Sequence, residues 1–225
     1  REIFEYAKKR AGVVGKENIF DFSIGNPSVP APEIVNETIK KLVDTVPSTE
    51  LHGYTSAVGD NSVREAIAGY LNKTYGTSFR KENFYMTVGA AASLTITLTA
   101  LHEEGDEVII LAPFFPEYRV FAEKAGMKPV IVLSDEKTLL PDFAAIENAI
   151  TEHTKAVIIN SPNNPSGVVL DEECVKTLSA LLEKKQKEFG KPIFIISDEP
   201  YRELVYGNVK VPFMTKYYDN TIVCY

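Results

Sequence analysis

The sequence contains no tryptophan and only two cysteines among its 225 residues. Cys174 and Cys224 form neither a C-x-x-C motif nor the dense cysteine pattern of a disulfide scaffold, so we expect a reducing, cytoplasmic setting. Apolar runs are short as well. The run at 108–115 is interrupted by Pro113 and is far below the roughly 20 residues that cross a bilayer. The sequence therefore predicts no disulfide framework and no membrane span.

Positive charge is scarce and scattered. The 24 Lys and Arg are outnumbered by 31 Asp and Glu, which gives a net charge of −7, and basic residues occur singly or in pairs such as Lys40-Lys41. A nucleic-acid backbone requires a basic stripe or patch, which is absent. The three histidines, His52, His102 and His153, lack the i, i+4 spacing of a metal site. We expect neither a nucleic-acid partner nor a bound metal.

From residue 83 onward, short apolar runs alternate with segments of helical periodicity. The expected strands cover 84–88, 107–111, 129–133, 156–160, 193–197 and 221–225. The expected helices in this part cover 90–102, 117–125, 143–150 and 172–189, and two further helices, at 33–43 and 61–73, are expected before it. This alternation is typical of an α/β fold with a largely parallel sheet and helices on both faces.

The N-terminal part of the chain has a different character. A proline-rich stretch at 25–32 lies inside residues 1–46, where we predict an N-terminal arm and part of a small domain. Residues 47–225 are predicted to form a large α/β domain. Because the apolar run at 221–225 has the pattern of a buried strand, we expect this domain to be incomplete and the chain to be a fragment of a longer protein.

Four turns that follow expected strands carry residues of chemical interest. In the first, Gly89, Ala90 and Ala91 begin a helix, where free backbone N–H groups and the helix dipole favour a phosphate. The alternative is that Gly89 only permits a tight turn. Neither G-x-G-x-x-G nor G-x-x-x-x-G-K-[ST] is present, which argues against a dinucleotide or a nucleoside triphosphate.

The next two turns carry aromatic and amide side chains. Phe114 and Phe115 lie between two prolines after the strand at 107–111, where an aromatic ring could stack on a planar cofactor or simply cap the core. Asn164 precedes Pro165, which restricts it to extended conformations and so orients its amide. An ordinary Asn-Pro turn is the alternative.

The fourth turn contains a carboxylate and a phenol. Asp198 ends a strongly apolar run, where an ion needs a cationic partner, and Tyr201 follows three residues later. Both side chains could address one ligand. The alternative is that Asp198 caps a helix that has Pro200 in its first turn.

Taken together, the four turns favour one ligand with a phosphate, a flat ring and a ring nitrogen that a carboxylate keeps protonated. Pyridoxal 5'-phosphate has these three features. Its protonated ring is an electron sink that stabilises a carbanion at the Cα of an amino acid.

On these residues the sequence resembles the fold-type I, class I/II aminotransferases of the aspartate aminotransferase superfamily. The matching stretches agree in order and spacing with that family along essentially the whole chain. They are His52-Gly53-Tyr54, Gly59 with Arg64-Glu65-Ala66, Val88-Gly89-Ala90-Ala91, Pro113-Phe114-Phe115, Ser161-Pro162-Asn163-Asn164-Pro165-Ser166-Gly167 and Ser197-Asp198-Glu199-Pro200-Tyr201. The resemblance implies that residues 47–225 are the cofactor-binding large domain, without its C-terminal part.

The resemblance implies a role for each residue around the cofactor ring. Asp198 would pair with the pyridinium nitrogen, and Tyr201 and Asn164 would hydrogen-bond the phenolic oxygen. Phe115 would stack on the ring.

Further roles concern the phosphate and the substrate. The amides of residues 89–91 would hold the phosphate, and Tyr54 would reach the phosphate of a neighbouring subunit, which implies a homodimer with shared sites. Gly25 and Asn26 match a loop that closes over the substrate.

The sequence also departs from the family. Ala90 and Ala91 replace residues that in many relatives add a side-chain contact to the phosphate. The lysine that forms the Schiff base and the arginine that binds the substrate α-carboxylate match positions beyond residue 225, and neither Lys210 nor Lys216 matches a family position. The resemblance therefore implies no catalytic residue within this chain.

The implied activity is pyridoxal-phosphate-dependent transamination between an amino acid and a 2-oxo acid, through internal and external aldimines. Two alternatives stay open at this point. One is a C–S or β-lyase on the same scaffold, and the other is a non-catalytic, aminotransferase-like effector domain of a transcriptional regulator.

Overall fold

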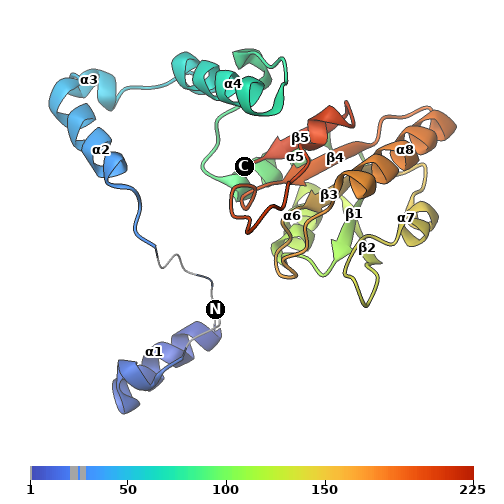
Figure 1. Ribbon diagram of the computed structural model, residues 1–225, viewed down its shortest axis with the longest axis horizontal. Coiled ribbons are helices and arrows are strands. Elements are labelled where there is room, and N and C mark those ends of the chain that lie inside the picture. Colours follow the sequence, from blue (N-terminus) through green and yellow to red (C-terminus); the bar gives the residue numbers. More distant parts are fainter. Residues whose placement is uncertain (1, 21–24, 26–28) are drawn as a thin grey trace. The chain divides into compact units, whose positions relative to one another are not determined.

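The computed structural model describes residues 2–20, 25 and 29–225 (Figure 1). The chain divides into two compact units, residues 1–55 and 56–225. The boundary predicted between residues 46 and 47 concerns the domains of a longer protein and stays a prediction. No helix within the described residues is long and apolar enough to cross a membrane.

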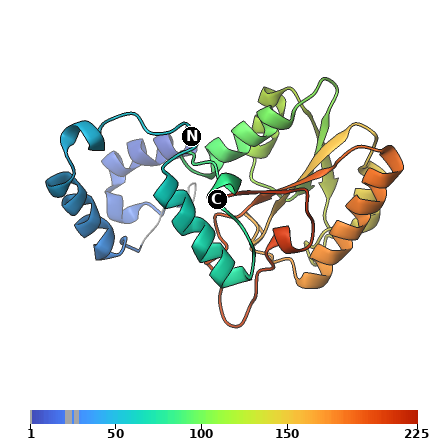
Figure 2. The same cartoon turned by 90° about the horizontal axis from the view of Figure 1, so that it is seen from above.

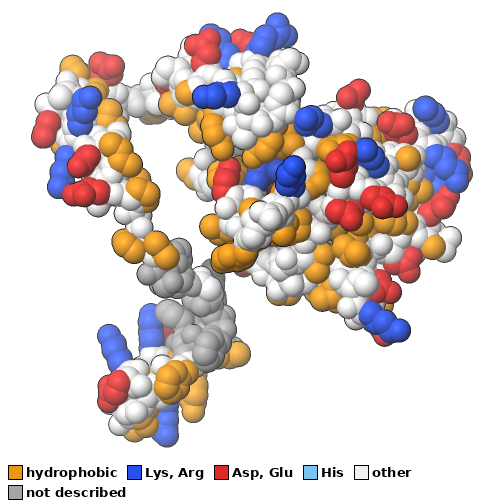
Figure 3. Space-filling model, viewed as in Figure 1, with side chains coloured by type: hydrophobic (Ala, Val, Ile, Leu, Met, Phe, Trp, Pro, Cys, Tyr) orange, Lys and Arg blue, Asp and Glu red, His pale blue; other side chains and the backbone are white. Residues whose placement is uncertain are grey.

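The first unit is helical. It contains α1 (Glu2–Val14), a 3₁₀ turn η1 (Lys16–Asn18), α2 (Glu33–Thr45) and α3 (Ser48–Leu51). The helix expected at 33–43 is confirmed as α2, whereas α1 lies where only an arm was predicted. No residue of this unit whose burial the structure describes is buried, and Figure 3 shows hydrophobic side chains at the surface of α2.

The second unit contains the sheet. Its helices are α4 (Asn61–Tyr75), α5 (Ala90–Leu101), α6 (Glu117–Ala125), α7 (Phe143–Ala149) and α8 (Glu172–Phe189), with 3₁₀ turns η2 (Lys81–Asn83) and η3 (Met214–Lys216). Its strands are β1 (Glu107–Ala112), β2 (Lys128–Leu133), β3 (Thr154–Asn160), β4 (Phe194–Asp198) and β5 (Thr221–Cys224). The strand order is β2-β1-β3-β4-β5, and every pairing is parallel.

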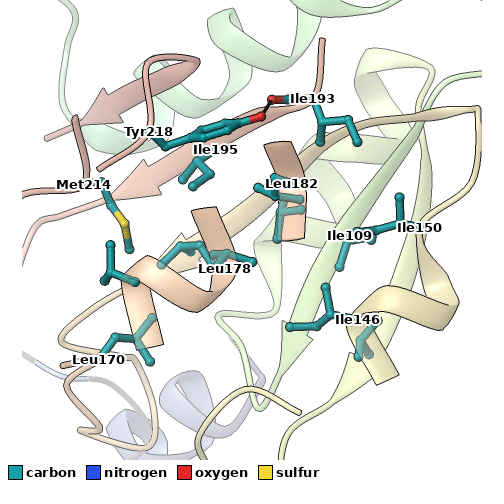
Figure 4. Close-up of a cluster of buried hydrophobic side chains, with 14 residues drawn as sticks. Ile109, Ile146, Ile150, Leu170, Leu178, Leu182, Ile193, Ile195, Met214 and Tyr218 are labelled. Atoms are coloured by element: carbon teal, nitrogen blue, oxygen red, sulfur yellow. Dashed lines mark hydrogen bonds between the residues drawn. The ribbon is translucent and has the colours of Figure 1, made fainter. Parts of the chain in front are cut away.

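Helices cover both faces of this sheet, as predicted (Figure 2). Side chains alternate along each strand, so β1 sends Ile109 to one face and Ile110 to the other. On the first face, Ile109 belongs to a buried cluster with Ile146 of α7 and Leu182 of α8 (Figure 4). On the opposite face, Ile110 belongs to a cluster with Leu98 of α5. The parallel strands are therefore buried on both sides.

The prediction of a strand at 84–88 is wrong. This segment has no strand pairing in the described sheet. Its Phe84 N–H donates to the Lys81 carbonyl and its Met86 N–H to the Val58 carbonyl, each at 3.1 Å. The side chain of Val88 is 95% exposed. A run of β-favouring residues forms a strand only beside a hydrogen-bonding neighbour, and the described sheet offers none here.

Candidate cofactor site

The candidate site lies at the carboxyl ends of the strands, which share one edge because the sheet is parallel. At this edge Asn160, the last residue of β3, pairs in register with Asp198, the last residue of β4. After β1 the chain adds β2 on one side of it and then crosses to add β3 on the other side. The direction in which strands are added therefore reverses between β1 and β3. Open α/β sheets bind ligands at such a switch point.

One pocket at this edge gathers six of the predicted cofactor residues. It is lined by Ala90, Ala91, Leu94, Phe115, Tyr118, Asn160, Asn164, Asp198, Pro200 and Tyr201. These residues come from the start of α5, the loop after β1, the start of α6, the end of β3 with the loop after it, and the end of β4 with the turn after it. Side chains that are distant in sequence thus meet around one small space.

Asp198 has an unmet hydrogen-bonding capacity. It is 5% exposed, and its Oδ2 accepts a hydrogen bond from the Tyr118 hydroxyl. Its Oδ1 is buried without a hydrogen-bond partner. Burial raises the pKa of Asp198 above its ordinary value, the Tyr118 hydrogen bond opposes that shift, and the charge of Glu199 adds to it. A cation beside Oδ1 would relieve the cost of burying this carboxylate.

The turn after Asp198 excludes the helix-cap alternative. Asp198 is itself the last residue of β4, and residues 200–203 form a turn rather than a helix. Leu204 donates its N–H to the Tyr201 carbonyl at 2.9 Å and closes this turn. Asp198 therefore does not serve as a helix cap.

Two asparagines join the ends of β3 and β4. The Asn160 Nδ2 donates to the Asp198 backbone carbonyl at 2.9 Å, and its Oδ1 accepts from the Asn164 N–H at 2.6 Å. Asn164 in turn donates from Nδ2 to the Tyr201 hydroxyl at 3.3 Å. Both an amide N–H and a phenol O–H can donate to one ligand oxygen. Asn164 and Tyr201 are close enough together to do so.

An aromatic ring lines the same pocket. Phe115 is half-buried and lies edge-on to Tyr118, with 5.6 Å between ring centroids and 80° between ring planes. It packs at the margin of the cluster that covers this face of the sheet. Phe115 therefore contributes both to the core and to the pocket wall.

The start of α5 supplies backbone donors. No side chain caps this helix, so the N–H groups of its first residues, which begin at Ala90, have no partner within the helix. Gly89 precedes them with φ 89°, a conformation that other residues rarely adopt. The helix thus presents free N–H groups next to the pocket, as an anion requires.

The remaining predicted residues lie in the other unit. Tyr54 is fully exposed within residues 1–55, and Gly25 is exposed as well. Asn26 lies outside the described residues. Their predicted contacts with a neighbouring subunit and with substrate stay predictions.

Sequence reasoning missed Tyr118 and Asn160. Tyr118 has the spacing of a core aromatic in α6, and Asn160 belongs to an apolar strand run. Each carried a detectable signal, because a polar group at the start of a helix or at the end of an apolar strand must find a partner when it is buried. Within the described residues, no group of three or more His, Cys, Asp or Glu could hold a metal ion.

Comparison with known proteins identifies the family of this chain. The family model described as "Aminotransferase class I and II" matches residues 17–225. The chain belongs to this aminotransferase family. The sequence match therefore extends over nearly the whole chain.

Individual aminotransferases are similar over a similar length. Aspartate aminotransferase of Pyrococcus horikoshii is 36% identical over 225 residues, which is 99% of this chain and 54% of that protein. A probable N-acetyl-LL-diaminopimelate aminotransferase of Bacillus subtilis is 32% identical over 94% of this chain and 51% of its own. The chain thus spans about half the length of these relatives.

Solved structures agree in fold. An amino transferase from Eubacterium rectale is 62% identical and superposes with a TM-score of 0.97, covering 100% of this chain and 57% of that one. Aspartate aminotransferase from Thermus thermophilus, solved with maleate, is 27% identical with a TM-score of 0.82, covering 97% and 55%. The aminotransferase family implies pyridoxal 5'-phosphate as cofactor.

The residues present fit that cofactor. The unpartnered Oδ1 of Asp198 suits a protonated ring nitrogen, which is a cation with a hydrogen to donate. The uncapped start of α5 suits a phosphate. Asn164, Tyr201 and Phe115 offer two donors and an aromatic face between these points.

Proposed function

We propose that this chain supplies the cofactor-holding part of a pyridoxal-phosphate-dependent aminotransferase that moves an amino group from an amino acid to a 2-oxo acid. The observation that carries the proposal is the buried, unpartnered Oδ1 of Asp198 in a pocket with Phe115, Asn164 and Tyr201. Family membership supports it independently. Because the relatives named above differ in the substrate that their names state, we propose the substrate class alone.

Each residue of the pocket has a part in this proposal. Asp198 would hold a proton on the ring nitrogen, while Asn164 and Tyr201 would bind the phenolic oxygen. Phe115 would pack on the ring face, and the N–H groups of residues 89–91 would bind the phosphate. When bound, the cofactor supplies an electron sink for negative charge at the Cα of the amino acid.

We further propose that the full-length protein is cytoplasmic and forms a homodimer. Tyr54 would bind the phosphate of the partner subunit, and Gly25 with Asn26 would close over the substrate. The lysine that anchors the cofactor would lie beyond residue 225. These parts of the proposal rest on the resemblance described above.

The test uses the full-length protein with pyridoxal phosphate. We expect borohydride reduction to add the mass of one reduced cofactor to a lysine, and a ¹⁵N-labelled amino acid to pass its label to an added 2-oxo acid. Loss of the label as ammonia, with a new oxo acid formed, would instead show a lyase. Reversible cofactor binding without turnover of any amino acid would indicate an effector domain.

A further inference from the structure

A tyrosine at the start of α6 contacts the carboxylate on which the proposed function depends. Tyr118 is 2% exposed, and its hydroxyl donates to Oδ2 of Asp198, 80 positions further along the chain. The N–H of Tyr118 donates to the Phe115 carbonyl at 3.0 Å, which fixes the first turn of α6 to the loop after β1. Hydrogen bonds thus hold Tyr118 both at its backbone N–H and at its hydroxyl.

This contact makes the two oxygens of the carboxylate unequal. Oδ2 is occupied by the hydroxyl, and Oδ1 is left as the buried oxygen without a partner. The backbone of Asp198 is held separately, because Asn160 donates to its carbonyl. Rotation of the carboxylate would break the bond to Tyr118, so the side chain has one preferred orientation.

The same contact favours the ionised carboxylate. A hydrogen bond to a carboxylate stabilises its charged form, and this bond opposes the effect of burial on the pKa of Asp198. Without the bond, Asp198 would hold a proton more strongly and would compete with a ring nitrogen for it. Tyr118 also meets Phe115 edge-on, so one side chain braces both the carboxylate and the aromatic wall.

We propose that Tyr118 is a positioning residue, whose hydroxyl orients Asp198 with Oδ1 toward the cofactor ring nitrogen and keeps the shared proton on that nitrogen. This inference rests on the proposed function. Tyr118 acts through Asp198 and takes no part in the reaction itself.

The experiment measures the protonation state of the cofactor ring nitrogen rather than the rate of turnover. The full-length protein is loaded with pyridoxal phosphate that carries ¹⁵N in its ring, because the ring ¹⁵N resonance distinguishes pyridinium from neutral pyridine. Tyr118→Phe should move the resonance toward neutral pyridine. It should also weaken binding of 4'-deoxypyridoxine 5'-phosphate, which cannot bond covalently to a lysine, about tenfold, the scale of one hydrogen bond to a charged group.

Tyr218→Phe is the matched control. Tyr218 is also a buried tyrosine, 3% exposed, and donates its hydroxyl to the Ile193 carbonyl at 2.6 Å in the other core cluster. The control variant should keep the wild-type resonance and affinity. A Tyr118→Phe variant with the wild-type resonance and affinity would overturn the proposal.

Two further measurements separate this role from simple packing. In an Asp198→Asn background the ring nitrogen has lost its carboxylate, so Tyr118→Phe should cause no further change in the resonance. Replacement of Tyr118 by 3-fluorotyrosine keeps the ring and makes the hydroxyl a stronger donor, so the resonance should move toward pyridinium. This replacement tests the proposal even where the phenylalanine variant fails to fold.

The outcomes distinguish this inference from the proposed function. A wild-type protein that binds no labelled cofactor would overturn the proposed function and this role with it. A wild-type protein that binds the cofactor as pyridinium, with all Tyr118 variants unchanged, would overturn the role of Tyr118 alone.

Discussion

Two neighbouring carboxylates at the end of β4 are both buried, but they differ in their hydrogen-bond partners. Glu199 is 2% exposed, and both of its oxygens are occupied, one by the Ser197 hydroxyl at 2.7 Å and the other by the Nε of Arg202. Asp198 is 5% exposed and has one oxygen without a partner. Burial of a carboxylate therefore does not identify a site. The incomplete set of partners does.

The ion pair of Glu199 belongs to a larger structural device. Arg202 also donates to the carbonyls of Val211 and Pro212, each at 3.0 Å, and its guanidinium lies over the rings of Tyr75 and Phe213. These contacts fasten the segment after β4 to the sheet and to α4. The fold thus pairs Glu199 with a cation of its own, whereas Asp198 has no cationic partner among the described residues.

The largest effect on stability is expected from removing the charge of Glu199, the carboxylate with a complete set of partners. Glu199→Gln leaves the Arg202 charge buried and unpaired, so the free energy of unfolding should fall by about 3–5 kcal/mol. Urea unfolding of the full-length protein measures it. Glu203→Gln is the control, because Glu203 is exposed and should change stability by less than about 0.5 kcal/mol. Equal losses in the two variants would contradict the comparison.

Removing the charge of Asp198, the carboxylate with one oxygen unpartnered, should change stability little and ligand affinity more. Asp198→Asn removes a buried charge that has no cationic partner among the described residues, so stability without cofactor should stay within about 1 kcal/mol of wild type. The affinity for 4'-deoxypyridoxine 5'-phosphate should fall by about 1.5–3 kcal/mol, the scale of a charged hydrogen bond. Titration calorimetry measures this change. Asp171→Asn, at the start of α8, should bind as wild type does, and undiminished binding by the Asp198 variant would refute the assigned contact.

A subtler change tests the geometry of the arginine. Arg202→Lys keeps the charge but cannot donate to Glu199, Val211 and Pro212 together, so unfolding should become easier by about 1–2 kcal/mol. Arg119→Lys offers a control, since Arg119 pairs with Glu123 on the exposed surface of α6 and should lose less than about 0.5 kcal/mol. A fully stable Arg202→Lys variant would show that charge alone suffices.

The smallest effect concerns pH. Because the folded pKa of Asp198 is raised, mainly by burial, the folded protein binds this proton more tightly than the unfolded chain does. The stability contributed by this group is therefore complete below the ordinary pKa of 3.8 and is lost as the pH rises through the folded pKa. Without cofactor, the stability advantage of wild type over Asp198→Asn should therefore shrink as the pH rises. A saturating cofactor should abolish this slope, and a slope that persists would argue against a cation beside Oδ1.

Sequence patterns predicted the elements that carry strong periodicity. The helices at 117–125 and 172–189 have the bounds that were expected, and five of the six expected strands form. The sixth, at 84–88, failed because its composition says nothing about a pairing neighbour. α1 was missed because its sequence neighbours suggested an irregular arm.

The candidate site was predictable in its chemistry and only partly in its connections. Asp198, Asn164 and Phe115 stand next to Pro or at the end of apolar runs, and these are local signals. The hydrogen bond of Tyr118 to Asp198 joins residues 80 positions apart, so a local pattern can indicate that a buried polar group needs a partner but cannot identify that partner. Asn160 was missed for the same reason, since its partners become visible only when β3 and β4 lie side by side.

The strand order has a consequence for how the chain is made. The sheet starts with β1, to which β2 adds on one side, and β3, β4 and β5 then add in turn on the other. Each strand after β1 can dock on a strand already synthesised, and none has to insert between two strands that have already paired. The sheet can therefore grow outward as the polypeptide leaves the ribosome. The pocket is completed late, because Asp198, Pro200 and Tyr201 emerge only after the other residues that line it.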